Sequence, residues 1–288
     1  MLQSPALSAK LISQLAKRPE HHKYDHGHAL VLSGPPGKGG AARLAAQAAL
    51  RVGAGVVTLA CARAAVAEHA AQVTAIMICG LDSADSLAAV LAEPRINALC
   101  IGPGMGLDDA AERLLRQSLA VARPTVLDAD ALSLFQHRPA SLFAMTHAAC
   151  VLTPHAGEFA RLFPDLSARQ TADPRYDKRA ATRDAATRAG CVVLYKGSET
   201  VIAAPDGRCH INAATADWAA PWLATAGSGD VLAGLITGLL ARGFTPYDAA
   251  ITGAWLHVEC ARSFGPGLIA EDLPRMVPSV LSKLSGQV

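Results

Sequence analysis

Short apolar runs alternate along this chain with glycine-bearing loops and longer segments rich in Ala and Leu. Many of the runs are apolar at successive positions, as expected for strands that are covered on both faces. The seven runs are residues 29–33, 56–60, 75–79, 98–101, 125–127, 150–153 and 192–195. The helical segments between them are 40–51, 84–92, 109–121 and 174–189. This alternation predicts a three-layer α/β/α sandwich around a mostly parallel sheet.

The pattern changes after Lys196. Residues 200–204 and 208–212 flank Pro205-Asp206-Gly207, a turn sequence typical of an antiparallel hairpin, so the sheet is expected to be mixed. Helices are expected at 230–242, at 246–263 and after 271. No low-complexity linker or repeat interrupts the chain, which favours a single α/β domain over residues 1–288.

Composition narrows the class of partner. Charged residues make up 17% of the chain and give a net charge of +2, and no Lys/Arg run is present, so we expect no nucleic-acid partner. No segment approaches the roughly 18 apolar residues that span a bilayer. Residues 1–20 are amphipathic and predict a helix instead of a signal peptide. The partner is therefore expected to be a small molecule.

The seven cysteines indicate the compartment. They form no C-x-x-C pair and mostly border apolar runs. Such cysteines are typical of reduced, buried thiols, so we expect a cytoplasmic protein.

Polar and glycine-rich segments follow several strands, where ligands of open parallel sheets gather. Gly102-Pro103-Gly104-Met105-Gly106 could expose backbone N–H groups to an anion. Asp128 and Asp130 could orient a magnesium-bound water or a substrate hydroxyl, or one of them could cap the next helix; the sequence favours neither. His155 is a candidate substrate contact, and Glu158 is expected in part to cap a helix.

Two other segments have the composition, but not the spacing, of a phosphate-binding loop and of a zinc site. The loop at 33–42 is glycine-rich and opens a helix, but it matches neither G-x-x-x-x-G-K-[ST] nor G-x-G-x-x-G. Four histidines, His21, His22, His26 and His28, fit no recurring zinc spacing and are expected to be a polar loop. We therefore assign no metal ligands from the sequence.

The segment at 224–234 carries the strongest signal for chemistry. Gly227, Ser228 and Gly229 run into an apolar helical segment, and glycine lets a phosphate approach the free N–H groups of a helix start. Asp230 lies at the junction, where it could take a proton from a hydroxyl beside that phosphate. The alternative is an ordinary helix start in which Ser228 or Asp230 is the N-cap.

The order of these motifs resembles the ribokinase-like superfamily: glycine loop, Gly-Pro-Gly, Asp-x-Asp, Thr-Pro-His-x-Gly-Glu, Lys-Gly-x-x-Thr and Gly-x-Gly-Asp. Within it, the chain looks most like the ADP- or ATP-dependent NAD(P)H-hydrate dehydratases. The resemblance implies that Ala41, Gly104 and His155 contact the hydrated nicotinamide nucleotide and that Asp230 is the base. It assigns adenine-nucleotide binding to Lys196, Gly197, Ser198, Glu199, Thr200 and Gly229.

The resemblance also implies a reaction and its cofactors. Such enzymes transfer a phosphoryl group to the C6 hydroxyl of NADHX or NADPHX; phosphate then leaves and the ring double bond is restored, with Mg²⁺ neutralising charge. The family implies ADP as the co-substrate, a homotetramer and a separate NAD(P)H-hydrate epimerase as the working partner. No second α/β unit precedes residue 22, so no epimerase domain is expected in this sequence.

One departure and two rival functions stay open. Residues 213–222 replace the Asn-Pro-Thr-Gly-Asn type of loop usual before the final motif, so a lid over the nucleotide or substrate could be altered. The first alternative function is a kinase of the same superfamily that phosphorylates a vitamin precursor or a sugar. The second is an adenine-nucleotide-binding protein without catalysis.

Overall fold

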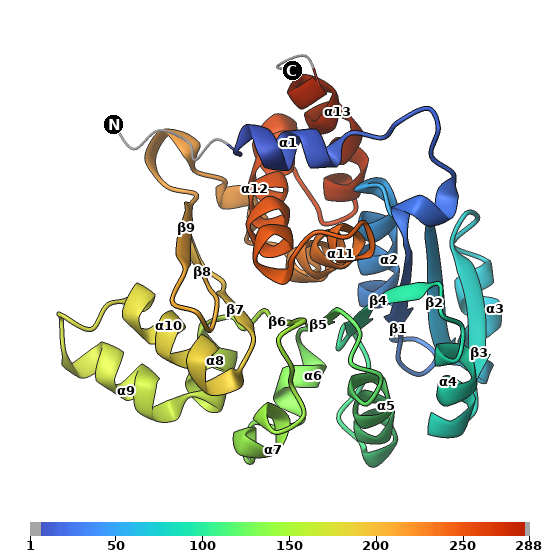
Figure 1. Cartoon of the computed structure of the whole chain (residues 1–288), viewed down its shortest axis with the longest axis horizontal. Helices are drawn as coiled ribbons and strands as arrows, with labels where there is room; N and C mark the ends of the chain where they lie inside the picture. The colour runs from blue at the N-terminus through green and yellow to red at the C-terminus, as the bar shows by residue number, and fades with distance from the viewer. Residues whose placement is uncertain (1–6, 286–288) are drawn as a thin grey trace.

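Nine strands form one mixed sheet in the computed structural model, which describes residues 7–285. The strand order is β3-β2-β1-β4-β5-β6-β7-β8-β9, with the first seven parallel and the last two pairings antiparallel (Figure 1). The strands are β1 (His28–Leu32), β2 (Val56–Ala62), β3 (Met77–Leu81), β4 (Ile96–Ile101), β5 (Thr125–Leu127), β6 (Cys150–Leu152), β7 (Val192–Tyr195), β8 (Glu199–Ala203) and β9 (Cys209–Ala213). The predicted mixed sheet and its hairpin are confirmed.

Helices cover both faces of the sheet (Figure 1). One layer contains α1 (Ala9–Leu15), α2 (Gly40–Arg51), α11 (Ser228–Ala241), α12 (Pro246–Phe264) and α13 (Asp272–Ser285). The other contains α4 (Ala84–Leu91), α5 (Asp109–Leu119), α6 (Asp130–Ser133), α7 (Pro139–Phe143), α8 (Ala156–Leu162), α9 (Pro164–Ala172) and α10 (Lys178–Ala189). The short α3 (Val66–Ala70) lies beside β3.

Side chains on the two faces of the sheet pack into two separate hydrophobic cores. In β1, Ala29 and Val31 pack into the core under α2 and α11, whereas Leu30 and Leu32 pack into the core on the opposite face. All four side chains are buried, because successive residues of a strand point to opposite faces and both faces are covered. The three-layer prediction is therefore confirmed at the level of single side chains.

Helix α11 packs unusually close to α2. A Cβ added to Gly234 would lie 2.6 Å from Cα of Ala45, and one added to Gly238 would lie 2.6 Å from the carbonyl oxygen of Ala49. These two glycines are one turn apart on the same face of α11. Small residues at this crossing allow close approach of the two backbones and fix where α11 begins.

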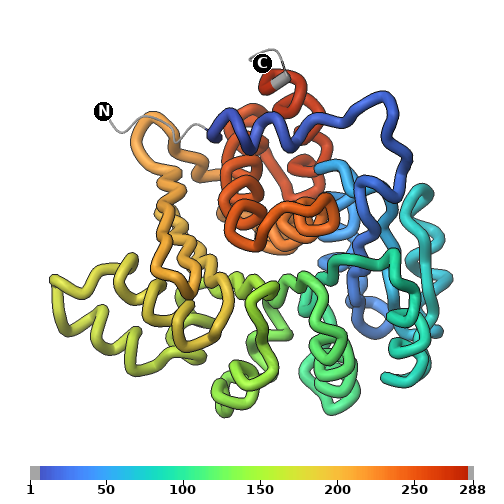
Figure 2. The backbone as a smooth tube through the Cα atoms, in the orientation of Figure 1, coloured from blue at the N-terminus to red at the C-terminus, as the bar shows by residue number. Residues whose placement is uncertain are grey.

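Helix α1 lies on the side of the molecule formed by α12 and α13. Figure 2 shows the amino-terminal segment crossing these helices, and α1 contacts α13. Arg242, just after α11, donates hydrogen bonds to the carbonyl oxygens of Val52 (2.8 Å), Gln14 (3.1 Å) and Leu15 (2.7 Å). One guanidinium therefore binds the carboxyl ends of both α1 and α2.

Several element boundaries differ from the predictions. The helix expected at 174–189 begins only at Lys178, because the Asp177 carboxylate caps it by accepting from the N–H of Ala180. The helix expected over 1–20 is α1, and residues 1–6 lie outside the described part. The short helices α3, α6, α7, α8 and α9 are not predicted, because segments of four to nine residues show too little periodicity. No helix within residues 7–285 is long and apolar enough to cross a membrane.

Candidate active site

The predicted site segments lie in a row along one edge of the sheet. They follow β1, β4, β5, β6 and β7, which are neighbours in that order, and the carboxyl ends of parallel strands share an edge. The amino terminus of α11 closes on the middle of this row. A Cβ added to Gly229 would lie 3.5 Å from Nζ of Lys196 and 4.0 Å from Oδ2 of Asp128. Charged side chains and a helix start thus converge at one point.

Helix α11 begins at Ser228, two residues before the predicted start. Gly227 is its N-cap, with φ +85°, a left-handed conformation that glycine adopts without strain, and no side chain caps the helix. The alternative in which Ser228 or Asp230 is the N-cap is therefore wrong. Within residues 7–285, the N–H groups of Gly229 and Asp230 have no hydrogen-bond partner. Free donors at the positive end of a 14-residue helix favour an anion.

His257 on α12 supports this helix start. Its Nε2 lies 2.9 Å from the carbonyl oxygen of Ser228 and 3.1 Å from the Ser228 hydroxyl. Burial lowers the pKa of His257 to about 4, so the ring is neutral near pH 7. The sequence predicts no role for this histidine, because it lies in an apolar helical run where a packed core histidine is the ordinary expectation.

Asp128 and Lys196 form a buried ion pair beside α11. Nζ of Lys196 lies 2.7 Å from Oδ1 of Asp128 and 3.9 Å from Oε2 of Glu158. The Thr153 hydroxyl donates a second bond to the same Asp128 oxygen, at 2.8 Å. Burial favours the neutral amine, but the two carboxylates outweigh it and raise the pKa of Lys196.

Neither Asp128 nor Asp130 caps the next helix. Helix α6 has Ala129 at its N-cap and no side-chain capping bond. Asp128 is bound to Lys196 and Thr153, whereas Asp130 accepts the N–H of Gly106 at 2.9 Å. The capping alternative is wrong, and the proposed contact of either carboxylate with a hydroxyl or a magnesium-bound water stays a prediction.

Asp230, in the first turn of α11, has a strongly perturbed carboxyl. Burial, followed by the nearby negative charge of Asp128, raises the pKa of Asp230 to about 7. A carboxylate with such a pKa can accept a proton near neutral pH, as a general base requires.

His155 caps α8. Its Nδ1 accepts the N–H groups of Gly157 (3.0 Å) and Glu158 (3.3 Å), and Glu158 accepts the N–H of His155 at 2.8 Å. The expected helix cap by Glu158 is thus confirmed as half of a capping box. The imidazole side chain is 55% exposed, so it is also available to a ligand.

The other predicted substrate contacts lie further along the edge. A Cβ added to Gly104, at φ +65°, would lie 3.6 Å from Cβ of Ala41, so the loops after β4 and β1 touch. The loop after β1 is held by Glu68, which accepts the N–H of Gly37 at 2.6 Å. The structure brings Ala41 and Gly104 together, whereas His155 lies nearer to Lys196.

A cavity of about 690 Å³ opens between the loop after β7 and α11. Of the predicted nucleotide and anion residues, Lys196, Gly197, Ser198, Thr200, Ser228 and Gly229 line it, and Glu199, Gly227 and Asp230 do not. Its walls include His155, Asn212, His257 and the 219–225 segment. The side chain of Glu199 is exposed, and its carbonyl oxygen accepts a bond from Lys178 at 2.6 Å.

The unusual loop at 213–222 forms a fixed wall of this cavity. Trp218 is 5% exposed, and its indole N–H donates to the Glu259 carboxylate on α12. Arg262 donates to the carbonyl oxygen of Asp217 at 2.8 Å. Trp222, by contrast, is 46% exposed. Trp218 therefore anchors the loop, and Trp222 lies at the surface.

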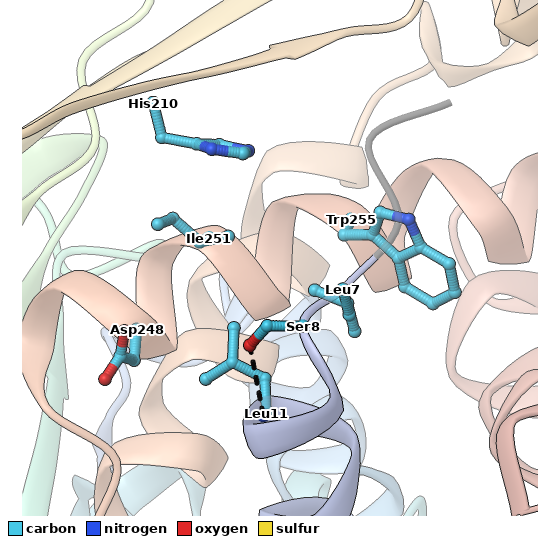
Figure 3. A pocket seen from close by; sticks show the side chains of 7 residues that line it. All are labelled: Leu7, Ser8, Leu11, His210, Asp248, Ile251 and Trp255. Carbon is cyan, nitrogen blue, oxygen red and sulfur yellow. Dashed lines mark hydrogen bonds between the residues drawn. The ribbon is translucent and has the colours of Figure 1, made fainter. Parts of the chain in front are cut away.

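A second cavity, of about 270 Å³, lies between α1, β9 and α12 (Figure 3). His210 points toward Ile251 across it, and Asp248 and Trp255 also border it. Among the described residues, no lysine or arginine lines it, whereas Lys196 lines the larger cavity.

The four amino-terminal histidines form no metal site. Among residues 7–285, no group of three or more His, Cys, Asp or Glu side chains is placed to hold a metal ion. The expectation of a polar loop is wrong for two of them: His26 lies in a short 3₁₀ helix and His28 in β1, both are buried, and His28 bonds the Thr58 hydroxyl at 2.8 Å.

Comparison with known proteins identifies relatives of this architecture. The family model described as NAD(P)H-hydrate dehydratase matches residues 29–278. The bifunctional NAD(P)H-hydrate repair enzyme Nnr of Moorella thermoacetica is 39% identical over 293 residues, covering 96% of this chain and 53% of that protein. The enzyme of the same name from Mycobacterium tuberculosis is 40% identical over 233 residues, covering 81% of this chain and 44% of its own. The chain thus spans about half the length of these curated relatives.

Solved structures agree with this result. The ADP/ATP-dependent NAD(P)H-hydrate dehydratase of Bacillus subtilis, co-crystallised with ATP/Mg²⁺, superposes with a TM-score of 0.78 at 26% identity, covering 99% of this chain and 100% of that one. A ribokinase-like superfamily protein of Enterococcus faecalis superposes with a TM-score of 0.80 at 24% identity, covering 96% and 95%. The latter supports the ribokinase-like fold.

Proposed function

Because this chain belongs to the NAD(P)H-hydrate dehydratase family, we propose that it repairs hydrated NADH and NADPH by an ADP-dependent dehydration. One observation carries the proposal. The Lys196 ammonium and Gly229, at the start of α11 with its free N–H groups, line a cavity large enough for a nucleotide, and the Asp230 carboxylate interacts electrostatically with the same Lys196.

Each reactant has a place in this arrangement. ADP would occupy the 690 Å³ cavity, with its phosphates at the Lys196–Thr200 loop and at Gly229. The hydrated nicotinamide nucleotide would lie along the sheet edge, against Ala41, Gly104 and His155. Asp230, in the first turn of α11, would then face the hydroxyl of one reactant and the phosphate of the other.

Two steps convert the hydrate. Asp230 takes the proton of the C6 hydroxyl, and the hydroxyl oxygen bonds to the β-phosphorus of ADP. The bond between that phosphorus and the oxygen that bridges it to the α-phosphate breaks, which releases AMP. The C6–O bond then breaks with its electron pair on phosphate, solvent water takes a proton from the neighbouring ring carbon, and the electrons of that C–H bond form the restored ring double bond. The N–H groups of α11 and Lys196 stabilise the charge on the transferred group.

Magnesium fits this proposal as a companion of the nucleotide. When bound, it neutralises charge on the phosphates. Mg²⁺ usually keeps several waters and binds through one or two carboxylates plus phosphate oxygens. The absence of a three-ligand cluster within the described residues agrees with that mode, and we assign it no protein ligand.

The decisive experiment incubates the protein with NADHX and ADP, ATP or neither, and follows the return of absorbance at the NADH band. The proposal requires recovery that depends on ADP, with one AMP and one phosphate for each NADH. Accumulation of a stable phosphorylated product would instead identify a small-alcohol kinase. Nucleotide binding without turnover would identify a binding protein.

The setting of the enzyme is also a proposal. All seven cysteines are free thiols, and five are buried, which supports a reducing, cytoplasmic compartment. One sheet joins elements from residue 28 to residue 213, which supports a single domain. A homotetramer and a separate epimerase partner rest on the family resemblance; light scattering and a coupled assay with that epimerase would test them.

A further inference from the structure

We propose that Asp128 is a positioning residue, whose carboxylate holds the Lys196 ammonium against the amino terminus of α11, where the phosphoryl group is transferred. The inference rests on the proposed function. It assigns Asp128 a role different from contact with a hydroxyl or a magnesium-bound water, because its action passes through Lys196.

The geometry fixes the Asp128 side chain. It is 1% exposed at the end of β5, and its Oδ1 accepts bonds from the Thr153 hydroxyl at 2.8 Å and from Nζ of Lys196 at 2.7 Å. These donors follow β6 and β7, so three neighbouring strands set one ion pair. Its other oxygen faces Gly229, 4.0 Å from where a Cβ would lie there.

Within residues 7–285, Glu158 is the one other carboxylate within 4 Å of the Lys196 ammonium. Oε2 of Glu158 lies 3.9 Å from Nζ, and that oxygen is held by the N–H of His155. Without Asp128, the ammonium would be drawn toward Glu158 and α8, away from Gly229. Because Lys196 lines the nucleotide cavity, this displacement would reach the phosphates, unlike the loss of a purely structural ion pair.

The pair also sets the charge around Asp230. The charged groups that face Asp230 are Asp128, Asp130, Glu158 and Lys196, and the nearby His257 is neutral. Asp128 is a negative neighbour of both the base and the incoming phosphates. Its removal should therefore lower the pKa of Asp230, while the displaced Lys196 weakens ADP binding and impairs the transfer step, a combination that general damage to the site would not produce.

The first test is Asp128→Asn in the full chain. We expect the Kd for ADP, measured by calorimetry without hydrate, to rise about 3–10-fold, because the Lys196 ammonium is drawn away from the phosphates toward Glu158. We expect kcat to fall about 10–100-fold, the usual effect of losing a group that orients a functional ligand. The acidic limb of kcat/KM should move to lower pH, because Asp230 loses its negative neighbour. Unchanged or tighter ADP binding would overturn the proposal.

A double-variant cycle tests the route through Lys196. If Asp128 acts by positioning Lys196, Asp128→Asn combined with Lys196→Met should have a kcat no lower than Lys196→Met alone. Multiplying losses would show that Asp128 acts independently and would refute the inference. Asp165→Asn, which breaks an exposed ion pair with Arg188, is the matched control and should change none of these quantities.

A milder variant covers the case in which Asp128→Asn fails to fold because Lys196 is left buried without its partner. Thr153→Val keeps both charges and removes one of the two bonds that orient Asp128. It should lower kcat about 2–5-fold without moving the pH limb, on the scale of one lost hydrogen bond. Full activity would contradict the positioning role. If wild type binds ADP but never converts the hydrate, the proposed function fails, and the ADP affinities still decide the role of Asp128.

Discussion

Replacing Gly234 by Ala in α11 should destabilise the protein, although alanine is the better helix former. Propensity alone predicts a gain of about 1 kcal/mol. The new Cβ, however, would lie 2.6 Å from Cα and 2.7 Å from the carbonyl carbon of Ala45 in α2. Ordinary contacts begin near 3.4 Å and the carbonyl oxygen of Ala45 is nearer still, so α11 and α2 would have to separate by more than about 0.8 Å.

The magnitude follows from opposing terms. Overpacking against backbone costs about 3 kcal/mol, at the upper end of the usual range, because a backbone cannot rotate away as a side chain can. Subtracting the propensity gain leaves a net loss of about 2 kcal/mol, and Tm should fall by about 4–8 °C. Asp230 lies one turn before Gly234, so its displacement should lower kcat by about 10-fold or more.

Thermal unfolding followed by circular dichroism measures the effect. Gly40→Ala is the matched stability control, because Gly40 is in α2 and its added Cβ would meet no atom within 4 Å. The control should unfold within about 0.5 kcal/mol of wild type, as uncrowded helical positions do. A Gly234→Ala protein that unfolds at or above the Tm of Gly40→Ala would refute the argument that this crossing fixes α11.

Three other predictions concern the site and its supports. Asp230→Asn should lower kcat about 10²–10⁴-fold with ADP affinity kept, measured by NADHX turnover and calorimetry; retained turnover would exclude Asp230 as base. Because burial raises the pKa of Asp230 to about 7, wild-type activity should rise with pH through 7. The free energy of unfolding should fall between pH 4 and 7, because only the unfolded chain has released the Asp230 proton there. Urea unfolding at a series of pH values that shows no such fall would contradict the raised pKa. Arg242→Ala should lose about 2–4 kcal/mol in the same unfolding assay, since four carbonyl oxygens lose a donor; a loss below about 1 kcal/mol would show that these bonds are dispensable.

Strand pattern predicted the sheet because long-range packing agrees with local sequence there. Continuous apolar runs indicated strands that are covered on both faces of a sheet. The Pro205-Asp206-Gly207 turn identified the antiparallel hairpin. Short helices such as α6 and α8 escaped, since a few residues carry no measurable period and their starts depend on contacts from elsewhere. The local sequence pattern therefore predicted the three-layer architecture but not the short helices that connect the strands.

The site also contains some residues that the local sequence could indicate and others that only the folded chain brings together. Gly227 and Asp230 could be proposed as site residues because they follow the other motifs in the order of the ribokinase-like superfamily; alone, glycine and a carboxylate at a helix start are also typical of an ordinary cap. The bond between Asp128 and Lys196 could not be found, because 68 residues separate the partners and only the strand order brings them together. His257 escaped for a related reason: its partner Ser228 lies 29 residues away on a different helix.

Because Trp218 anchors the loop at 213–222, this loop loses its conformational entropy during folding and not at ligand binding. A loop that closes over a ligand gives up its conformational entropy at binding and weakens affinity by that amount. Here the indole bond to Glu259 and the Arg262 bonds hold the loop before any nucleotide arrives, so that entropy is lost during folding. ADP would enter a preformed cavity, and its association rate would be set by diffusion and charge instead of by loop ordering.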